Sequence, residues 1–230
     1  MNKLELAGRL SKDPEIIEKD GKIVANISIA SGRPYKDSEG KDVTDFIPVT
    51  MFGEKAKQMK DLHKGDGISI LGSLENNNYE KDGKTIYKNQ VVGTKIVEIT
   101  GKDKITDKNH ITLEGNLTKK PKVTKTEEGK EVANVTVAVD RFGIDKADYI
   151  TVPFWDDEAH EVADKFEKGN EHVSLTGRLN SKLGLMEKNL DAKPLEKKVA
   201  KEEAKTEPEV EAPSTAEPVK ETAKDIEPEM

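Results

Sequence analysis

Four aromatic side chains stand at spacings that suit the stacking of nucleobases. Phe46 and Phe52 lie six residues apart in one apolar segment, and Tyr149 and Trp155 lie six residues apart in another. Residues separated by an even number point to the same face of a strand. The positions of opposite parity are apolar: Ile47, Val49, Met51, Ile150, Val152 and Phe154. We therefore expect the four aromatics on an outer face, where stacking contributes ~1–3 kcal/mol per base whatever the base sequence.

Further aromatic and cationic residues extend this candidate site. Arg33, Tyr35 and Lys36 place an aromatic between two cations at the end of the preceding strand, and Arg141 with Phe142 takes the matching place further along the chain. Cations beside stacked bases hold phosphates. The candidate nucleic-acid-binding residues are Arg33, Tyr35, Lys36, Phe46, Phe52, Tyr79, Arg141, Phe142, Tyr149 and Trp155. An oligomer contact remains the alternative use of some of these aromatics.

Other residue types give little sign of reaction chemistry. Lys119, Lys120 and Lys122 are expected to be solvated turn charges, and the four His are scattered without the spacing of metal ligands. The acidic run 156–158 falls at an expected helix start, where acids stabilise the helix dipole. Neither a phosphate-binding glycine loop nor a nucleophile with its base is found. We expect no enzyme, no metal and no cofactor.

The elements that must position these residues occur twice. Four segments of the first half recur in the same order in the second: 4–16 in 111–123, 20–30 in 128–138, 45–52 in 148–155, and 64–74 in 168–179. A domain duplication explains this most simply. We expect a first domain at 1–101, a second at 109–190, and a tail at 191–230.

Each copy has the same pattern of elements. Alternation at Leu4, Leu6 and Leu10 is typical of a half-buried strand, and it returns in later segments. A spacing of three after Phe52 predicts a short helix that ends near Gly65, and Gly169 is expected to end the matching helix. Three strands, a helix and two strands fit a five-stranded Greek-key barrel of the OB (oligonucleotide/oligosaccharide-binding) type. The expected fold is mainly β, with two tandem OB domains.

The tail differs from the rest of the chain in composition. Residues 191–230 are rich in Glu, Lys and Pro and hold no aromatic residue. Such a segment cannot bury enough apolar surface to offset the entropy of ordering. We predict a disordered acidic tail, which either only solubilises the protein, or docks partner proteins, or competes with nucleic acid.

Composition also bears on the compartment. The chain has no Cys, and no apolar run approaches the ~20 residues that span a bilayer. Its start, MNKLELAGRL, lacks the apolar core of a signal peptide. We expect a soluble protein of the cytoplasm, associated with the nucleoid and not with a membrane.

Residues 3–99 resemble the bacterial single-stranded-DNA-binding protein (SSB) family. The resemblance lies in the segments 8–15 (GRLSKDPE), 24–27 (VANI), 45–47 (DFI), 52–56 (FGEKA) and 64–66 (KGD). It implies an OB fold that binds single-stranded DNA in replication, recombination, repair or DNA transfer. An RNA-binding or translation-linked OB protein, and a protein-interaction OB module, are the alternatives.

The resemblance also implies which residues stack bases. The family's stacking aromatics fall on Tyr35, Phe46, Phe52 and Tyr79. The second copy is similar but more divergent. Phe142 is displaced by one position, and Leu183 and Leu185 stand where a hairpin aromatic would be, which suggests weaker DNA binding or an architectural role for this copy.

The resemblance implies protein partners as well. SSB proteins usually assemble four OB folds, and a chain with two copies would do so as a homodimer. The family's acidic tail usually ends in Phe and recruits replication and recombination proteins. This tail ends DIEPEM at residues 225–230, without the terminal aromatic.

Overall fold

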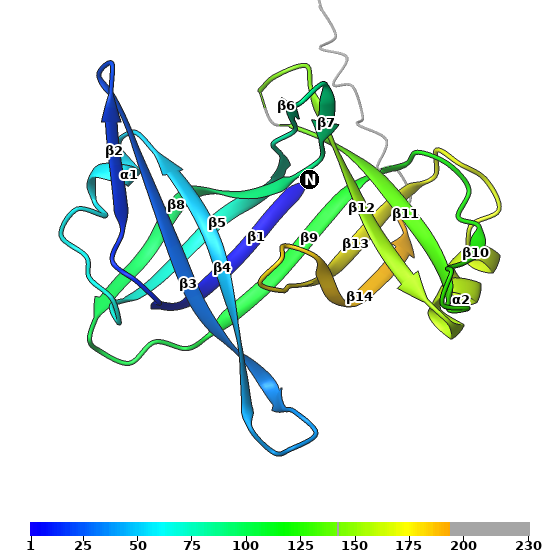
Figure 1. Cartoon of the computed structure of the whole chain (residues 1–230), viewed down its shortest axis with the longest axis horizontal. Coiled ribbons are helices and arrows are strands. Elements are labelled where there is room, and N and C mark those ends of the chain that lie inside the picture. The colour runs from blue at the N-terminus through cyan, green and yellow to red at the C-terminus, as the bar shows by residue number, and fades with distance from the viewer. Residues whose placement is uncertain (142, 194–230) are drawn as a thin grey trace, which may run out of the picture. The chain divides into compact units, whose positions relative to one another are not determined.

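The computed structural model describes residues 1–141 and 143–193 (Figure 1). The first copy contains β1 (Asn2–Leu10), β2 (Glu15–Lys19), β3 (Lys22–Lys36), β4 (Asp42–Phe52), α1 (Glu54–Lys57), β5 (Gly67–Asn76), β6 (Tyr79–Lys81), β7 (Lys84–Ile86) and β8 (Asn89–Gly101). The second contains β9 (Lys108–Leu117), β10 (Val123–Lys125), β11 (Glu131–Asp140), β12 (Ala147–Trp155), α2 (Asp157–Lys165), β13 (His172–Leu179) and β14 (Leu185–Ala192). Phe142 and tail residues 194–230 lie outside the described residues.

The first copy is a closed five-stranded barrel, as its pattern predicts. β1 pairs with β3 and β5, β5 pairs with β8, β8 pairs in parallel with β4, and β4 pairs with β3, which completes the ring. Gly8 permits the tight β1–β3 contact, because a Cβ there would lie 2.1 Å from the carbonyl oxygen of Ala30. The second copy has a glycine at the matching position: at Gly115 a Cβ would lie 2.0 Å from the carbonyl oxygen of Ala138.

The second copy repeats most of this ring, but one side differs. β9 pairs with β11 and β13, β11 with β12, and β13 with β14, while no ladder joins β12 to β14 in the described part of the chain. In the first copy, Gly93 of β8 lets this strand approach Met51 of β4. The second copy has Glu187 and Lys188 at the matching bulge opposite Gly177.

Lys188 spans the gap between β14 and β12 with its side chain. Its Nζ lies 4.9 Å from the centre of the Phe154 ring of β12 and 2.9 Å from a carboxylate oxygen of Glu158. The side chain is only 10% exposed. A cation–π contact and packing of the lysine stem therefore close a side that backbone hydrogen bonds close in the first copy.

The two copies share one sheet. β1 pairs antiparallel with β9, from Asn2 opposite Leu113 to Ala7 opposite Lys108. Glu5 of β1 accepts hydrogen bonds from Lys108 and Lys3, which lower the pKa of its carboxyl to about 2. The hydrogen-bonded path of strands therefore runs without a break from one copy into the other.

The helices are shorter than the sequence suggests. α1 ends at Lys57, so the expectation that Gly65 ends it was wrong; turns fill the interval, and Met59 still reaches the core. α2 ends at Lys165, four residues before Gly169. Its N-cap is Asp156, within the acidic run at the expected helix start, although the side chain makes no capping hydrogen bond. Among the described residues, none of the helices has the length and apolarity needed to cross a membrane.

Candidate nucleic-acid interface

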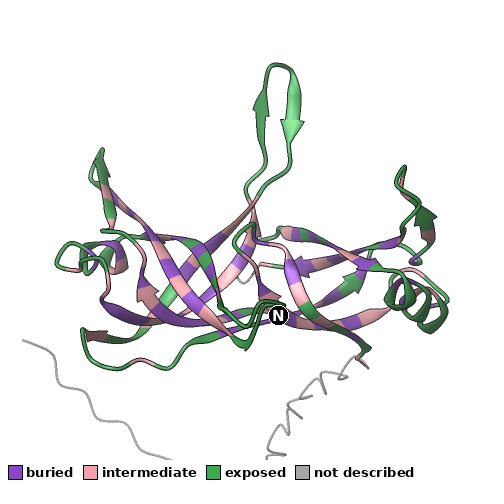
Figure 2. Cartoon of the chain, turned by 60° about the horizontal axis from the view of Figure 1, so that its bottom comes forward, coloured by how far each residue is buried: buried purple, intermediate pink, exposed green. Residues whose placement is uncertain are grey.

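The outer faces of β4 and β12 carry the aromatics that strand alternation places there. Phe46 and Phe52 are 50% and 46% exposed, and Tyr149 and Trp155 are 58% and 41% exposed. The intervening residues of opposite parity are buried in the barrels: Ile47, Val49, Met51, Ile150, Val152 and Phe154. The alternation of buried and exposed positions along the strands is visible in Figure 2. The predicted exposure of all four aromatics is confirmed.

A groove of about 460 Å³ lies beside Phe46, lined mostly by the first copy and in part by the second. Lys12 and Lys88 supply cations there, while Asn26, Asn77 and the neighbouring amides supply donors and acceptors. The remaining lining side chains belong to Glu15, Ile27, Ser28, Pro48, Val49, Thr50, Asn89, Gln90, Val91, Ser181 and Leu183. An aromatic, amides and lysines together suit a nucleotide, whose base stacks and whose phosphate carries the charge.

The β6–β7 hairpin stands out from the barrels, and its strand residues are exposed (Figure 2). Tyr79 on β6 is exposed, so its ring is accessible to a ligand. Tyr87, just after β7, is 81% exposed. Strand alternation missed Tyr87, because it lies outside any periodic run. The available signal was its place just after β7, because β7 ends at Ile86, which pairs with Tyr79 at the start of β6.

The two candidate arginines are held in bidentate ion pairs. Arg33 donates to both carboxylate oxygens of Asp45 at 2.8 and 2.9 Å, and Arg141 donates to those of Asp148 at 2.8 and 2.6 Å. Both aspartates are buried. These bonds raise the pKa of each arginine above its usual value. A phosphate would have to compete with a buried carboxylate for each arginine, so the arginines add little free positive charge. Each instead holds the aspartate that directly precedes Phe46 or Tyr149.

Tyr35 and Lys36 lie on the extension of β3. The Tyr35 hydroxyl accepts a hydrogen bond from Arg33 at 3.3 Å, and the guanidinium carbon lies 5.9 Å from the ring centre. Arg33 thus links the buried Asp45 to an exposed aromatic. Lys36 faces Asp42 at 3.7 Å, and both side chains are exposed. An ion pair of this kind is weak, so Lys36 is free to turn toward a phosphate.

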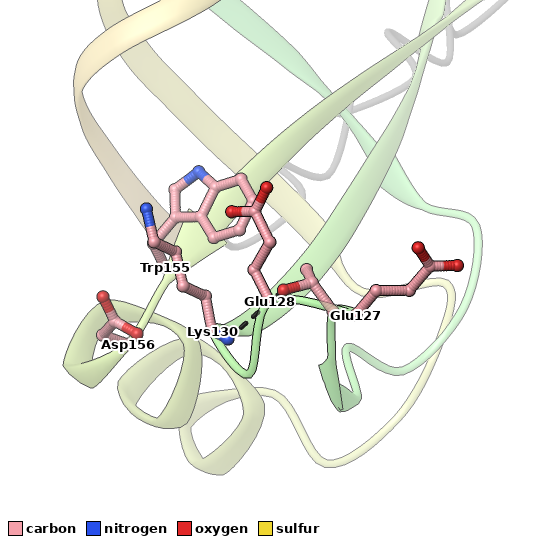
Figure 3. A pocket seen from close by; sticks show the side chains of 6 residues that line it. Glu127, Glu128, Lys130, Trp155 and Asp156 are labelled. Atoms are coloured by element: carbon pink, nitrogen blue, oxygen red, sulfur yellow. Dashed lines mark hydrogen bonds between the residues drawn. The ribbon is translucent and has the colours of Figure 1, made fainter.

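Trp155 lies in a hollow of about 630 Å³ on the second copy (Figure 3). Glu127, Glu128 and Asp156 line it together with Thr126 and Lys130. Three carboxylates against one lysine disfavour a phosphate beside the indole. The structure thus places acidic charge close to an aromatic that is otherwise well exposed for stacking.

A second hollow of the same copy has the opposite charge. Lys119, Lys120 and Lys122 line about 370 Å³ with Thr124 and Asn134. Asn134 pairs with Pro153 on β12, two residues before Trp155. The sequence suggested only solvated turn charges here. The repeat held a signal, since Lys119 aligns with Lys12 of the first groove.

The hairpin position of the second copy carries no stacking group. Leu183 and Leu185 are both buried in the core. The described residues contain no group of three His, Cys, Asp or Glu that could hold a metal ion. The outer face of the second copy therefore presents Tyr149 and Trp155, lysines at one hollow and carboxylates at another.

Sequence relatives match the chain over its first copy. A single-stranded DNA-binding protein of Oceanobacillus iheyensis is 32% identical over 99 residues, which are 42% of this chain and 62% of the relative. Single-stranded DNA-binding protein 1 of Clostridium acetobutylicum is 36% identical over 100 residues, 42% of this chain and 91% of the relative. The chain thus spans less than two thirds of the first relative's length.

A solved structure matches over both copies. The single-stranded DNA binding protein from Thermus aquaticus superposes with a TM-score of 0.65, covering 94% of this chain and 96% of that one at 21% identity. This likeness supports the fold. The sequence pattern that describes the Single-strand binding protein family matches residues 1–99 and again 108–204. With most of its length matched in two successive segments, the chain belongs to the single-strand binding protein family.

Proposed function

We propose that this protein binds single-stranded DNA without sequence preference. One observation carries the proposal: exposed aromatics stand at the same two outward positions of β4 in the first copy and of β12 in the second. Stacking on such groups accepts any base but requires that the bases be unpaired. The names of the sequence relatives support the same ligand.

The first copy is expected to bind more tightly. Its groove combines Phe46 with two lysines, and the hairpin adds Tyr79 and Tyr87. The second copy offers Tyr149 and Trp155, but carboxylates line the hollow around Trp155. Phosphate repulsion there weakens the contribution of that aromatic.

The biological role follows from the mode of binding. A non-enzymatic protein that stacks any unpaired base coats and protects strands exposed in replication, recombination or DNA transfer. Such strands lie in the nucleoid, so we place the protein in the cytoplasm with the chromosome. Residues 201–230 are acidic and repel DNA, so removing them leaves the affinity unchanged or raises it.

The domain division 1–101 and 109–190 and the homodimer are parts of the same proposal. Two copies per chain supply four OB folds as a dimer. Light scattering with a size standard measures the mass directly: we expect twice the 25.5 kDa of the chain. A mass equal to one chain at micromolar concentration would rule out the dimer.

Fluorescence anisotropy with labelled oligonucleotides tests the proposed ligand. Equal lengths of oligo(dT), the corresponding RNA and a DNA duplex are titrated at two salt concentrations. We expect oligo(dT) to bind most tightly and the duplex least, with an affinity that falls as salt rises. Tighter binding of RNA would indicate an RNA-binding protein, and no binding of any nucleic acid would point to a protein-interaction module.

A further inference from the structure

The two copies contact each other at equivalent positions beside their aromatics. Asn76 ends β5, and Ser181 follows β13; each lies two residues after the last leucine aligned by the repeat. The backbone N–H of Tyr149 donates to Asn76 Oδ1 at 2.6 Å. The backbone N–H of Phe46 donates to Ser181 Oγ at 2.9 Å. Each copy thus holds the first outward aromatic residue of the other by its main chain.

The contact around Asn76 is the more extensive one. Asn76 Nδ2 donates to the carbonyl oxygen of Tyr149 at 3.2 Å, and the Asn76 N–H donates to Asp148 Oδ1 at 2.7 Å. Arg141 Nη2 donates to the Asn76 carbonyl oxygen at 3.0 Å, and Arg141 Nη1 pairs with Glu75 at 3.0 Å. Main-chain and side-chain groups of Asn76 therefore bind the second copy, next to the fully buried Asp148.

These bonds fix the backbone of the residue from which each aromatic side chain projects. Both main-chain groups of Tyr149 are bound to one side chain, so rotation of that residue would break two hydrogen bonds at once. At the matching contact, Ser181 and Leu183 of the second copy line the groove beside Phe46 of the first. A ligand in that groove therefore contacts side chains from both copies.

We propose that Asn76 and Ser181 are positioning residues that lock the stacking faces of the two copies together, so that one DNA strand is bound by both faces as a unit. The proposal rests on single-stranded DNA binding as the function. It makes Asn76 act through Tyr149, and Ser181 through Phe46. Asn76 does not line the groove around Phe46, whereas Ser181 both lines it and holds Phe46 by its main chain.

Double-mutant cycles test this assignment. The affinity of the full chain for labelled oligo(dT) of about 30 nucleotides, long enough for two OB folds, is measured by anisotropy. We expect Asn76→Ala to weaken binding about 3- to 10-fold, the range of one or two lost hydrogen bonds. In a Tyr149→Ala background the same substitution should cost almost nothing further, because the group that it positions is gone.

Crossed pairs of substitutions serve as the matched control. When Asn76→Ala is combined with Phe46→Ala, the two fold-losses of oligo(dT) affinity should multiply. Ser181→Ala should behave the other way round. It should cause no further loss of affinity in a Phe46→Ala background, and its fold-loss should multiply with that of Tyr149→Ala. A general loss of stability would multiply with either aromatic alike. If circular dichroism shows that Asn76→Ala does not fold, Asn76→Ser and Ser181→Ala, which remove fewer bonds, are measured in its place.

The outcomes separate the two proposals. If the unaltered protein does not bind oligo(dT), the proposed function fails. If it binds, but Asn76→Ala multiplies with Tyr149→Ala as it does with Phe46→Ala, the positioning role is overturned while DNA binding stands. A Tyr149→Ala protein with unchanged affinity overturns the role of Asn76 in the same way.

Discussion

Exposed aromatics are the residues on which the proposed function depends. Within the described residues, only Phe154 and Phe166 among the aromatic side chains are buried. Burial of such rings is favourable, so a chain with few aromatics that leaves most of them in water requires another use for them. Their repetition in matched positions favours a ligand with many similar flat groups over a single contact.

Replacing the stacking rings of the first copy tests this use. We predict that Phe46→Ala and Phe52→Ala each weaken oligo(dT) binding by ~1–3 kcal/mol. Both side chains are about half exposed, so the fold should survive, which thermal melting would show. Phe52→Trp is the matched control, because an indole also stacks. Unchanged affinity in both alanine variants would contradict the assignment of this face.

The carboxylates at Trp155 make a separate prediction. Neutralising the hollow with Glu127→Gln and Glu128→Gln should raise oligo(dT) affinity up to about fivefold at low salt, since phosphate repulsion is removed. The gain should shrink as salt rises. Glu39→Gln, in the distant β3–β4 turn, is the control. A gain that is independent of salt would show that charge is not the cause.

At the scale of elements, the strand faces and the five-stranded barrel of the first copy could be predicted from the sequence, whereas the different closure of the second copy could not. Alternation is local, so Phe46, Phe52 and their counterparts could be assigned to a face without any tertiary contact. The pairing of Arg33 with Asp45, by contrast, depends on how two strands lie side by side. In the described part of the chain no ladder joins β12 to β14, and this too depends on how the strands lie once they are assembled.

Lys188 replaces that ladder, and its removal should destabilise the second barrel. We predict that Lys188→Ala lowers the free energy of unfolding by about 1–2 kcal/mol through loss of the Phe154 contact and of stem packing. Lys182→Ala, in an exposed turn, should change it by less than about 0.5 kcal/mol. Urea unfolding measures both. Equal effects of the two substitutions would mean that Lys188 does not close the barrel.

At the scale of the whole molecule, the two copies are joined by β1 and β9, and a carboxylate helps to hold them. Because hydrogen bonds from Lys108 and Lys3 lower the pKa of Glu5 to about 2, its contribution is present above about pH 4.5. It is lost as the pH falls from there toward 2. Sequence alone could not pair these residues, since the register of β1 on β9 is a tertiary property.

Glu5→Gln tests this link. The variant should unfold more easily than the unaltered protein at pH 6, by roughly 1 kcal/mol, because the lysines are half exposed and screened by water. The difference should shrink between pH 4.5 and 2, where the unaltered carboxyl becomes protonated. Denaturant unfolding across this range measures it. A difference that stays constant with pH would show that the ion pairs of Glu5 do not join the copies.

The single tryptophan allows the most direct test of base stacking by this molecule. Trp155 lies on the outer face of the second copy and is 41% exposed, so a stacked base would quench its fluorescence. We would titrate the full chain with oligo(dT) and, in parallel, with a duplex of equal length. We predict strong quenching by the single strand and none by the duplex. Unchanged fluorescence with saturating oligo(dT), or equal quenching by the duplex, would contradict stacking of unpaired bases across both copies.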